Sequence, residues 1–151
     1  MSNKQRKMDT GELLGVLERS SSFGDAMESC SVSVDDPALH SHLLDLLKAH
    51  DYTPSELILK VNLSKSFVYQ ILNGTRVPGR DILIRISLAV GLDLDETQRL
   101  LAVARRGRLY PRIRRDAAII FCLSRKRTLD QANDLLEEIG EKTLLPENMD
   151  E

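Results

Sequence analysis

The sequence predicts an all-α protein, and three observations support this fold class. From residue 37 onward the chain consists of short segments whose apolar residues recur at the spacing of an amphipathic helix. Residue pairs typical of helix N-termini precede several of these segments, and Gly or Asn follows them. Aromatic residues make up only 4% of the chain and Trp is absent, so Leu and Ile must fill the core, which favours helices over a sheet sandwich.

Length and composition describe an ordinary globular chain. Its 151 residues suit one compact domain with a short appendage. No segment reaches the roughly 18 consecutive apolar residues of a membrane span. Cys30 and Cys122 are too isolated in the sequence for a disulfide framework. We therefore expect a cytoplasmic protein with no membrane partner.

Residues 1–38 are expected to form a flexible N-terminal arm. The stretch "SSSFGDAMESCSVSVDD" is rich in Ser and shows little periodicity, so it is predicted to be loop or disordered. The preceding "DTGELLGVLERS" could form a short helix that is capped by Asp9 and carries three leucines on one face: Leu13, Leu14 and Leu17. This helix is either part of a floppy tail or a docking element for a partner or a second subunit.

The first two helices after the arm are predicted by an apolar stripe and by a capping box. The stripe lies in "PALHSHLLDLLKAH" and consists of leucines at helical spacing: Leu39, Leu43, Leu46 and Leu47. Thr53 is a typical N-cap, Pro54 suits the first helical position, and Glu56 can reach back to the cap. A second helix is therefore expected to begin at residue 54.

The boundaries of the next helices are predicted by turn and cap residues. Asn62 tolerates the left-handed conformation and is expected to end the second helix. Ser64 can cap the third helix, which is expected to stop at the Asn-Gly pair 73–74. The segment "RDILIRISLAVG" predicts a fourth helix, and Asp93 with Glu96 predicts the start of a fifth over "ETQRLLAVAR".

The C-terminal third of the chain repeats part of the preceding sequence. Residues 80–111 align without gaps onto residues 115–146, an offset of 35 residues. Ten of the 32 aligned positions are identical, and most of them are apolar residues that would face a core: Arg80/Arg115, Asp81/Asp116, Ile84/Ile119, Leu88/Leu123, Leu94/Leu129, Asp95/Asp130, Leu100/Leu135, Leu101/Leu136, Leu109/Leu144 and Pro111/Pro146. We therefore expect a repeated helical hairpin, in which residues 106–146 form an extension packed on the first copy and residues 147–151 form an acidic tail.

The net charge of −2 conceals a strong asymmetry along the chain. Residues 1–38 carry a net charge of −3 and residues 39–98 carry −1. Residues 99–127 contain ten basic residues and one acid, a net charge of +9, whereas residues 128–151 carry −7. Local charge sets the electrostatic field that a phosphate backbone or an acidic partner meets, so the basic stretch is a candidate for such contacts.

The stretch from Leu43 to Glu96 contains several motif residues. They are Leu57, the turn Asn62-Leu63-Ser64, the apolar pair Val68 and Ile71, "NG" at 73–74, Pro78, and "AVGLDLDE" at 89–96. With these motifs, residues 39–105 resemble the helix-turn-helix domain of the Cro/C1 (XRE) repressor family. The resemblance implies a five-helix domain that binds duplex DNA. The chain differs from the usual family pattern at Pro54, where a DNA-contacting Gln is common, and at Ile58, where Ala is usual.

The resemblance also implies which residues meet DNA. Residues 64–73 would be the recognition helix, with Lys65, Ser66 and Gln70 where the family presents base-reading side chains. Lys65 could donate to guanine, and Gln70 could pair bidentately with adenine. The positions that grip the DNA backbone in the family are occupied by Ser64, Asn73, Gly74, Thr75 and Arg76.

Two aromatic residues in this helix leave alternatives open. Tyr69 falls on the same outer face and could reach a phosphate or a base, and Phe67 could touch a thymine methyl group. Alternatively, both side chains are partly buried against a neighbouring helix or a dimer mate. They could also form a protein-binding face, because exposed aromatic residues are typical interface anchors.

Arginines in the basic stretch are candidates for additional phosphate contacts, namely Arg105, Arg106, Arg108 and Arg112. They flank "LYP", which is expected to form the turn between the two repeats. The stretch could instead be a solvated surface. A third alternative is that the acidic segment after Thr128 folds onto the basic stretch and masks it.

No enzymatic chemistry is indicated. There is no Gly-rich phosphate loop or Ser/His/Asp grouping, and the three histidines lack metal-ligand spacing, so we expect no enzyme, cofactor or metal. We expect a repressor-like transcriptional regulator that binds duplex DNA as a homodimer, on half-sites about one helical turn apart. The alternative is a protein–protein interaction adaptor whose helix-turn-helix scaffold no longer reads bases. A protein partner could dock through the N-terminal arm or the C-terminal hairpin.

Overall fold

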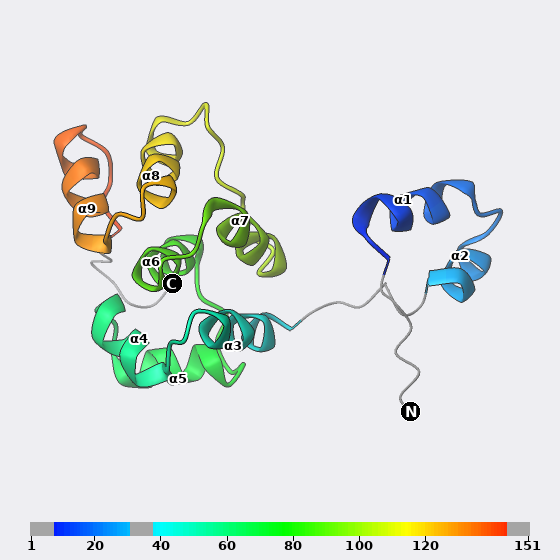
Figure 1. Cartoon of the computed structure of the whole chain (residues 1–151), viewed down its shortest axis with the longest axis horizontal. Helices are drawn as coiled ribbons and strands as arrows, with labels where there is room; N and C mark the ends of the chain where they lie inside the picture. Colours follow the sequence, from blue (N-terminus) through cyan, green and yellow to red (C-terminus); the bar gives the residue numbers. More distant parts are fainter. Residues whose placement is uncertain (1–7, 31–37, 145–151) are drawn as a thin grey trace. The chain divides into compact units, whose positions relative to one another are not determined.

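The computed structural model describes residues 8–30 and 38–144 (Figure 1). These residues form nine helices and no strand, which confirms the all-α prediction for the described part of the chain. The chain divides into two compact units, residues 1–37 and residues 38–151. Among the described residues, no helix is long and apolar enough to cross a membrane. The acidic tail, residues 147–151, lies outside the described residues.

The N-terminal unit contains two helices that pack against each other, α1 (Thr10–Arg19) and α2 (Phe23–Cys30). Helix α1 begins as predicted, because the side chain of Asp9 accepts a hydrogen bond from the amide of Glu12 at 2.7 Å. Helix α2 corrects the prediction of loop or disorder in the Ser-rich stretch. Ser22 Oγ accepts from the amide of Asp25 at 3.1 Å, so this serine caps the start of the helix.

Seven helices form the C-terminal unit: α3 (Leu39–Ala49), α4 (Pro54–Val61), α5 (Lys65–Leu72), α6 (Arg80–Val90), α7 (Leu94–Val103), α8 (Arg114–Ser124) and α9 (Leu129–Glu138). Helix α6 lies in the middle of this unit (Figure 1) and contacts α4, α7, α8 and α9. Every side chain from Ile82 to Leu88 is buried, so this helix is surrounded by protein on all sides. Helices α4, α7, α8 and α9 each cover one part of its surface.

Local capping interactions set the boundaries of the helices around the predicted motif. Thr53 and Glu56 form a capping box, and Asp93 and Glu96 form a second one, as predicted. Asn62 ends α4 in the left-handed conformation with φ 57°, and Ser64 Oγ accepts from an α5 amide at 3.1 Å. These contacts join α4 and α5 by a turn of only three residues.

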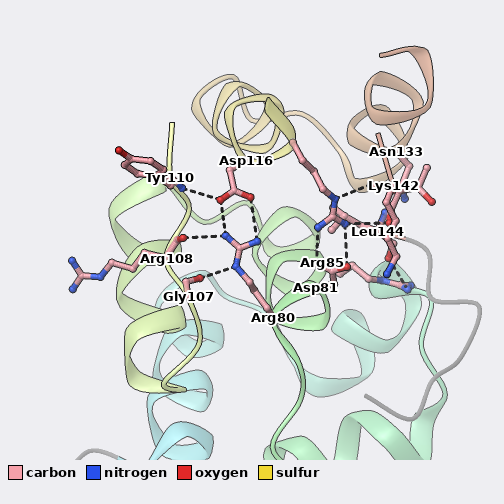
Figure 2. Close-up of polar contacts among 12 residues, drawn as sticks. Arg80, Asp81, Arg85, Gly107, Arg108, Tyr110, Asp116, Asn133, Lys142 and Leu144 are labelled. Carbon is pink, nitrogen blue, oxygen red and sulfur yellow. Dashed lines mark hydrogen bonds and ion pairs between the residues drawn. The ribbon is translucent and has the colours of Figure 1, made fainter. Parts of the chain in front are cut away.

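The 35-residue sequence repeat is matched by repeated geometry (Figure 2). Arg80 donates from Nε to Gly107 O at 2.7 Å and pairs with Asp116 at 2.8 Å. Arg115, which lies 35 residues later, donates from Nε to Lys142 O at 2.8 Å and pairs with Asp81 at 2.9 Å. Each repeat therefore supplies an arginine to the aspartate of the other. We call these two ion pairs, Arg80–Asp116 and Arg115–Asp81, the reciprocal clasps.

Backbone conformations repeat at the same offset. The left-handed residue after the first helix of each repeat is Gly91 (φ 82°) and then Lys126 (φ 53°). An amide side chain in the second helix accepts from the loop that follows. Gln98 Oε1 accepts from Leu109 N at 2.7 Å, and Asn133 Oδ1 accepts from Leu144 N at 2.6 Å. The second hairpin is thus built like the first, although only part of its sequence is identical.

Arg85 connects the second repeat to the turn between α4 and α5. Its guanidinium group donates to Val61 O at 2.6 Å, to Asn62 O at 3.0 Å and to Leu144 O at 3.2 Å. Burial lowers the pKa of Arg85, and the negative charge of Asp81 partly counteracts this effect. The acceptors at Val61 and Asn62 belong to the C-terminal end of α4, where the helix dipole favours a cation.

Gly74 should be sensitive to substitution for two physical reasons. It has φ +85°, and a Cβ atom there would lie 2.8 Å from His40 Nδ1. Gly91 is a matched control, because it has φ +82° but a Cβ atom would meet nothing within 4 Å. We expect Gly91→Ala to lower the free energy of unfolding by about 1–2 kcal/mol through backbone strain alone. Gly74→Ala should cost about 1 kcal/mol more, because the His40 ring must move.

Urea denaturation followed by circular dichroism measures both free energies. His40→Ala combined with Gly74→Ala should reduce the cost of the glycine substitution to that at Gly91. If the costs of Gly74→Ala and Gly91→Ala are equal in the wild-type background, the contact with His40 has no energetic importance.

Candidate nucleic-acid interface

Helix α5 has an inner and an outer face. The inner face packs in the core and consists of Phe67, Val68, Ile71 and Leu72. The exposed residues at the start of the helix and along its outer face are Ser64, Lys65, Ser66 and Tyr69, and Gln70 beside them is half-buried. Five of the ten residues that the sequence predicts to meet DNA therefore occupy adjoining positions on α5 and its cap.

The structure corrects the prediction that Phe67 touches DNA. Its side chain is only 4% exposed and belongs to the hydrophobic core, which agrees with the alternative of burial against a neighbouring helix. Phe67 precedes Ile71 by four residues and adjoins Val68, so helical geometry places it on the inner face. The Phe67 ring also has a charged neighbour, because the guanidinium carbon of Arg76 lies 4.7 Å from the ring centroid.

Tyr69 remains on the outer face, where its side chain is 40% exposed. Lys65 lies one helical turn earlier, and its Nζ atom is 6.0 Å from the centroid of the Tyr69 ring. A cation at this distance from an aromatic face is weakly attracted to it. The pair therefore places a positive charge near an aromatic ring on the exposed surface of α5.

The segment after α5 is held by hydrogen bonds among its own side chains. Asn73 Oδ1 accepts from the amide and the hydroxyl group of Thr75, at 3.0 and 2.7 Å. Arg76 Nη1 donates to Gln70 Oε1 at 3.5 Å. Gly74 turns the chain through the left-handed region next to His40. Four of the five residues predicted to grip the DNA backbone thus form one ordered turn at the C-terminal end of α5, whereas the fifth, Ser64, caps its N-terminal end.

Part of the arginine-rich loop lies beside this turn. Arg106 Nε donates to Pro78 O at 3.2 Å, which connects the loop to the segment that follows α5. The carbonyl groups of Gly107 and Arg108 accept from Arg80 at 2.7 and 3.0 Å, so the loop is fixed at the N-terminus of α6. The side chains of all four arginines predicted to bind phosphate, Arg105, Arg106, Arg108 and Arg112, are exposed.

The basic stretch is not uniformly available for a ligand. Arg115 is engaged in the clasp with Asp81, and Asp116, the single acid in the stretch, is paired with Arg80. Arg112 follows Tyr110, whose amide donates to Asp116 at 2.9 Å. The stretch therefore combines a structural part, which joins the two repeats, with an exposed part around Arg106.

Two residues that sequence reasoning missed contribute to this region. His40 packs against Gly74, and Pro78 supplies the carbonyl acceptor for Arg106. The position of Pro78 in the motif was a signal for a role in this region. Its contact with Arg106 could not be predicted, because the two residues are 28 positions apart. Within residues 8–30 and 38–144, no three His, Cys, Asp or Glu side chains gather in a way that could hold a metal ion.

Comparisons of the chain with protein-family models, with curated proteins and with solved structures found no match in any of the three cases.

Proposed function

We propose that this protein binds duplex DNA in a sequence-specific manner and acts as a dimeric, repressor-like regulator of transcription. The observation that carries the proposal is the outer surface of α5, where Ser64, Lys65, Ser66, Tyr69 and Gln70 lie together. A single exposed helix fits the major groove of B-DNA, and residues near its N-terminus can reach base edges. The resemblance of residues 39–105 to Cro/C1-type domains supports the same function.

The chemistry of these side chains suits base recognition. Lys65 can donate to the O6 and N7 atoms of guanine, and the amide group of Gln70 can both donate to and accept from adenine. Gln70 also accepts from Arg76, so its amide group is positioned before any ligand arrives. Such preorganisation lowers the entropic cost of binding.

Phosphate contacts would come from both ends of the helix. The first amide groups of a helix lack intrahelical partners and favour anions, and Ser64 lies at that end of α5. At the other end, Arg76 and Arg106 lie on segments joined by the hydrogen bond from Arg106 to Pro78. These cations would fix the position of α5 on the duplex without reading its sequence.

The proposal is tested by selecting a binding site from random duplexes with the full chain and measuring affinity against salt concentration. We expect a linear log–log plot with a slope of about −0.9 per phosphate neutralised. Lys65→Ala and Gln70→Ala should each relax the sequence preference at one base pair and cost about 1–3 kcal/mol. Arg106→Ala should weaken binding to all sequences alike and reduce the slope by about 1.

The matched control is Lys142→Ala, which removes an exposed cation that follows α9. This variant should keep both the affinity and the sequence preference. Absence of salt-dependent binding to any selected duplex would contradict the proposal. Equal affinities of the wild-type protein and the Lys65→Ala, Gln70→Ala double variant would also contradict it.

A second candidate function is that of a protein–protein interaction adaptor. It is favoured by exposed apolar side chains on α5 and on the segment that follows it, since Tyr69 is 40% exposed and Val77 is 55% exposed. Exposed aromatic and aliphatic residues of this kind anchor many protein interfaces. In that case Tyr69→Ala should abolish a protein complex, whereas Lys65→Ala and Gln70→Ala should have no effect on it.

A further inference from the structure

The two copies of the repeated hairpin have different neighbours. Residues of the α6–α7 hairpin correspond to residues of the α8–α9 hairpin with an offset of 35. Ile86 corresponds to Phe121, and Leu100 corresponds to Leu135. Because the two hairpins share backbone geometry, a difference in exposure at matched positions shows where one copy has a neighbour that the other lacks.

In the first copy, the face of the hairpin that carries Ile86 and Leu100 is covered by helices. Helix α4 contacts α6, and helix α3 contacts α7. His50 at the end of α3 pairs with Glu96 of α7 at 2.8 Å, and Tyr52 donates to the α6 carbonyl of Ala89 at 3.3 Å. Ile86 and Leu100 are consequently buried, with exposed fractions of 1% and 0%.

In the second copy the matched face is open within the described residues of the C-terminal unit, 38–144. Phe121 is 42% exposed, and Leu135 is only partly buried. Between α8 and α9 lies a hollow of about 250 Å³ whose lining includes Phe121, Cys122, Arg127, Asp134, Leu135 and Glu138. In Figure 1 these two helices lie on the far side of α6 from α3 and α4. Gln131 also lines the hollow and corresponds to Glu96, the α7 residue that pairs with His50 at the end of α3, so the hollow lies where α3 packs in the first copy.

We propose that the groove between α8 and α9 is a docking site for an amphipathic α-helix of a partner protein, which would pack there as α3 packs against α7. This inference goes beyond DNA binding and does not depend on it. The apolar part of such a helix follows from α3 itself. Leu43 and Leu47 are spaced four residues apart and are buried, with exposed fractions of 1% and 2%.

The charge of the partner helix follows from the differences between the two copies. Helix α3 packs against α7, and burial and, to a smaller degree, the positive charge of Arg99 on α7 lower the pKa of His42 on α3. The residue that corresponds to Arg99 in the second copy is Asp134, and Val103 corresponds to Glu138. The partner helix should therefore carry Lys or Arg at the position of His42, because opposite charges across an interface favour the correct partner.

A helical peptide derived from α3 is a suitable probe for the groove. Its sequence is that of residues 38–52 with His42→Lys, and a covalent link between the exposed positions 41 and 45 stabilises the helix. The matched control peptide carries His42→Glu and is otherwise identical. Binding of each peptide to the full chain is measured by fluorescence anisotropy.

We expect the Lys peptide to bind roughly fivefold more tightly than the Glu peptide, as one exposed charge pair would allow. In the Asp134→Lys variant of the protein this preference should be reversed, which identifies the groove as the site. Phe121→Ser should abolish binding of both peptides, and circular dichroism checks that the variants fold. Since Phe121 and Asp134 are exposed, neither substitution removes a core contact.

The proposal is overturned if the Lys peptide does not bind the wild-type protein, or if Asp134→Lys leaves the preference between peptides unchanged. It is also overturned if the protein forms a dimer in solution that Phe121→Ser dissociates, because a second copy of the chain would then occupy the groove. Failure of DNA binding would not affect any of these results.

Discussion

Arg85→Ala is expected to lower the free energy of unfolding of the C-terminal unit by about 3–5 kcal/mol. The side chain of Arg85 is 1% exposed and donates to three carbonyl groups, those of Val61, Asn62 and Leu144. Substitution by Ala leaves these acceptors without their donor and opens a cavity beside α6. Urea denaturation at neutral pH, followed by circular dichroism, measures the change.

Two further variants separate the contributions to this effect. Arg85→Lys keeps the charge, but a single ammonium group cannot span three carbonyl groups, so we expect an intermediate loss of about 1–3 kcal/mol. Arg99→Ala removes an exposed arginine of α7 and should change stability by less than about 0.5 kcal/mol. A loss below about 1 kcal/mol for Arg85→Ala would mean that water replaces the guanidinium group without penalty.

Asp116→Ala is expected to cost about 2–4 kcal/mol, more than the matched substitution Asp81→Ala, which should cost about 1–2 kcal/mol. The two aspartates occupy equivalent positions in the reciprocal clasps but differ in burial, with side-chain exposures of 3% for Asp116 and 19% for Asp81. Asp116 also accepts from the amide of Tyr110 at 2.9 Å. Removing Asp116 therefore leaves both a cation and a backbone amide without their acceptor.

The comparison is made by denaturation of the two single variants and of the double variant. Because the clasps share α6 and α8, the double variant should differ from the sum of the single changes. Asp116→Asn serves as a control, since the amide oxygen can still accept from Tyr110 while the charge is lost. Equal costs of Asp116→Ala and Asp81→Ala would contradict the role that we assign to burial and to the Tyr110 contact.

Helix boundaries were largely predictable from the sequence. The capping boxes at Thr53 and Asp93, the left-handed Asn62 and the N-cap Ser64 are all found where expected. Each depends on groups that lie within about four residues of one another, so local sequence carries the information. The exception is α2, because Ser-rich composition was interpreted as disorder although Ser22 caps a helix.

The candidate interface was predicted only in part. Exposure of Lys65, Ser66 and Tyr69 agrees with the predicted outer face of the third helix. Phe67 was wrongly included, because a sequence motif indicates positions but not the packing of a side chain against neighbouring helices. The contact of Arg106 with Pro78 could not be predicted, since a long loop can be placed in many ways.

The sequence by itself determined the all-α class, the order and limits of most helices, and the 35-residue repeat. Helix caps and apolar periodicity are short-range properties, which explains why they can be read without a structure. Only the tertiary structure decided that Arg80 and Arg115 cross to each other's repeat and that Arg85 bonds to the turn before α5. It also decided that the last hairpin keeps a face that no other part of residues 38–144 covers. The contacts of Arg80 and Arg115 across the repeats and of Arg85 with this turn join residues 23 to 36 positions apart, and their partners are selected by burial and by the packing of whole helices.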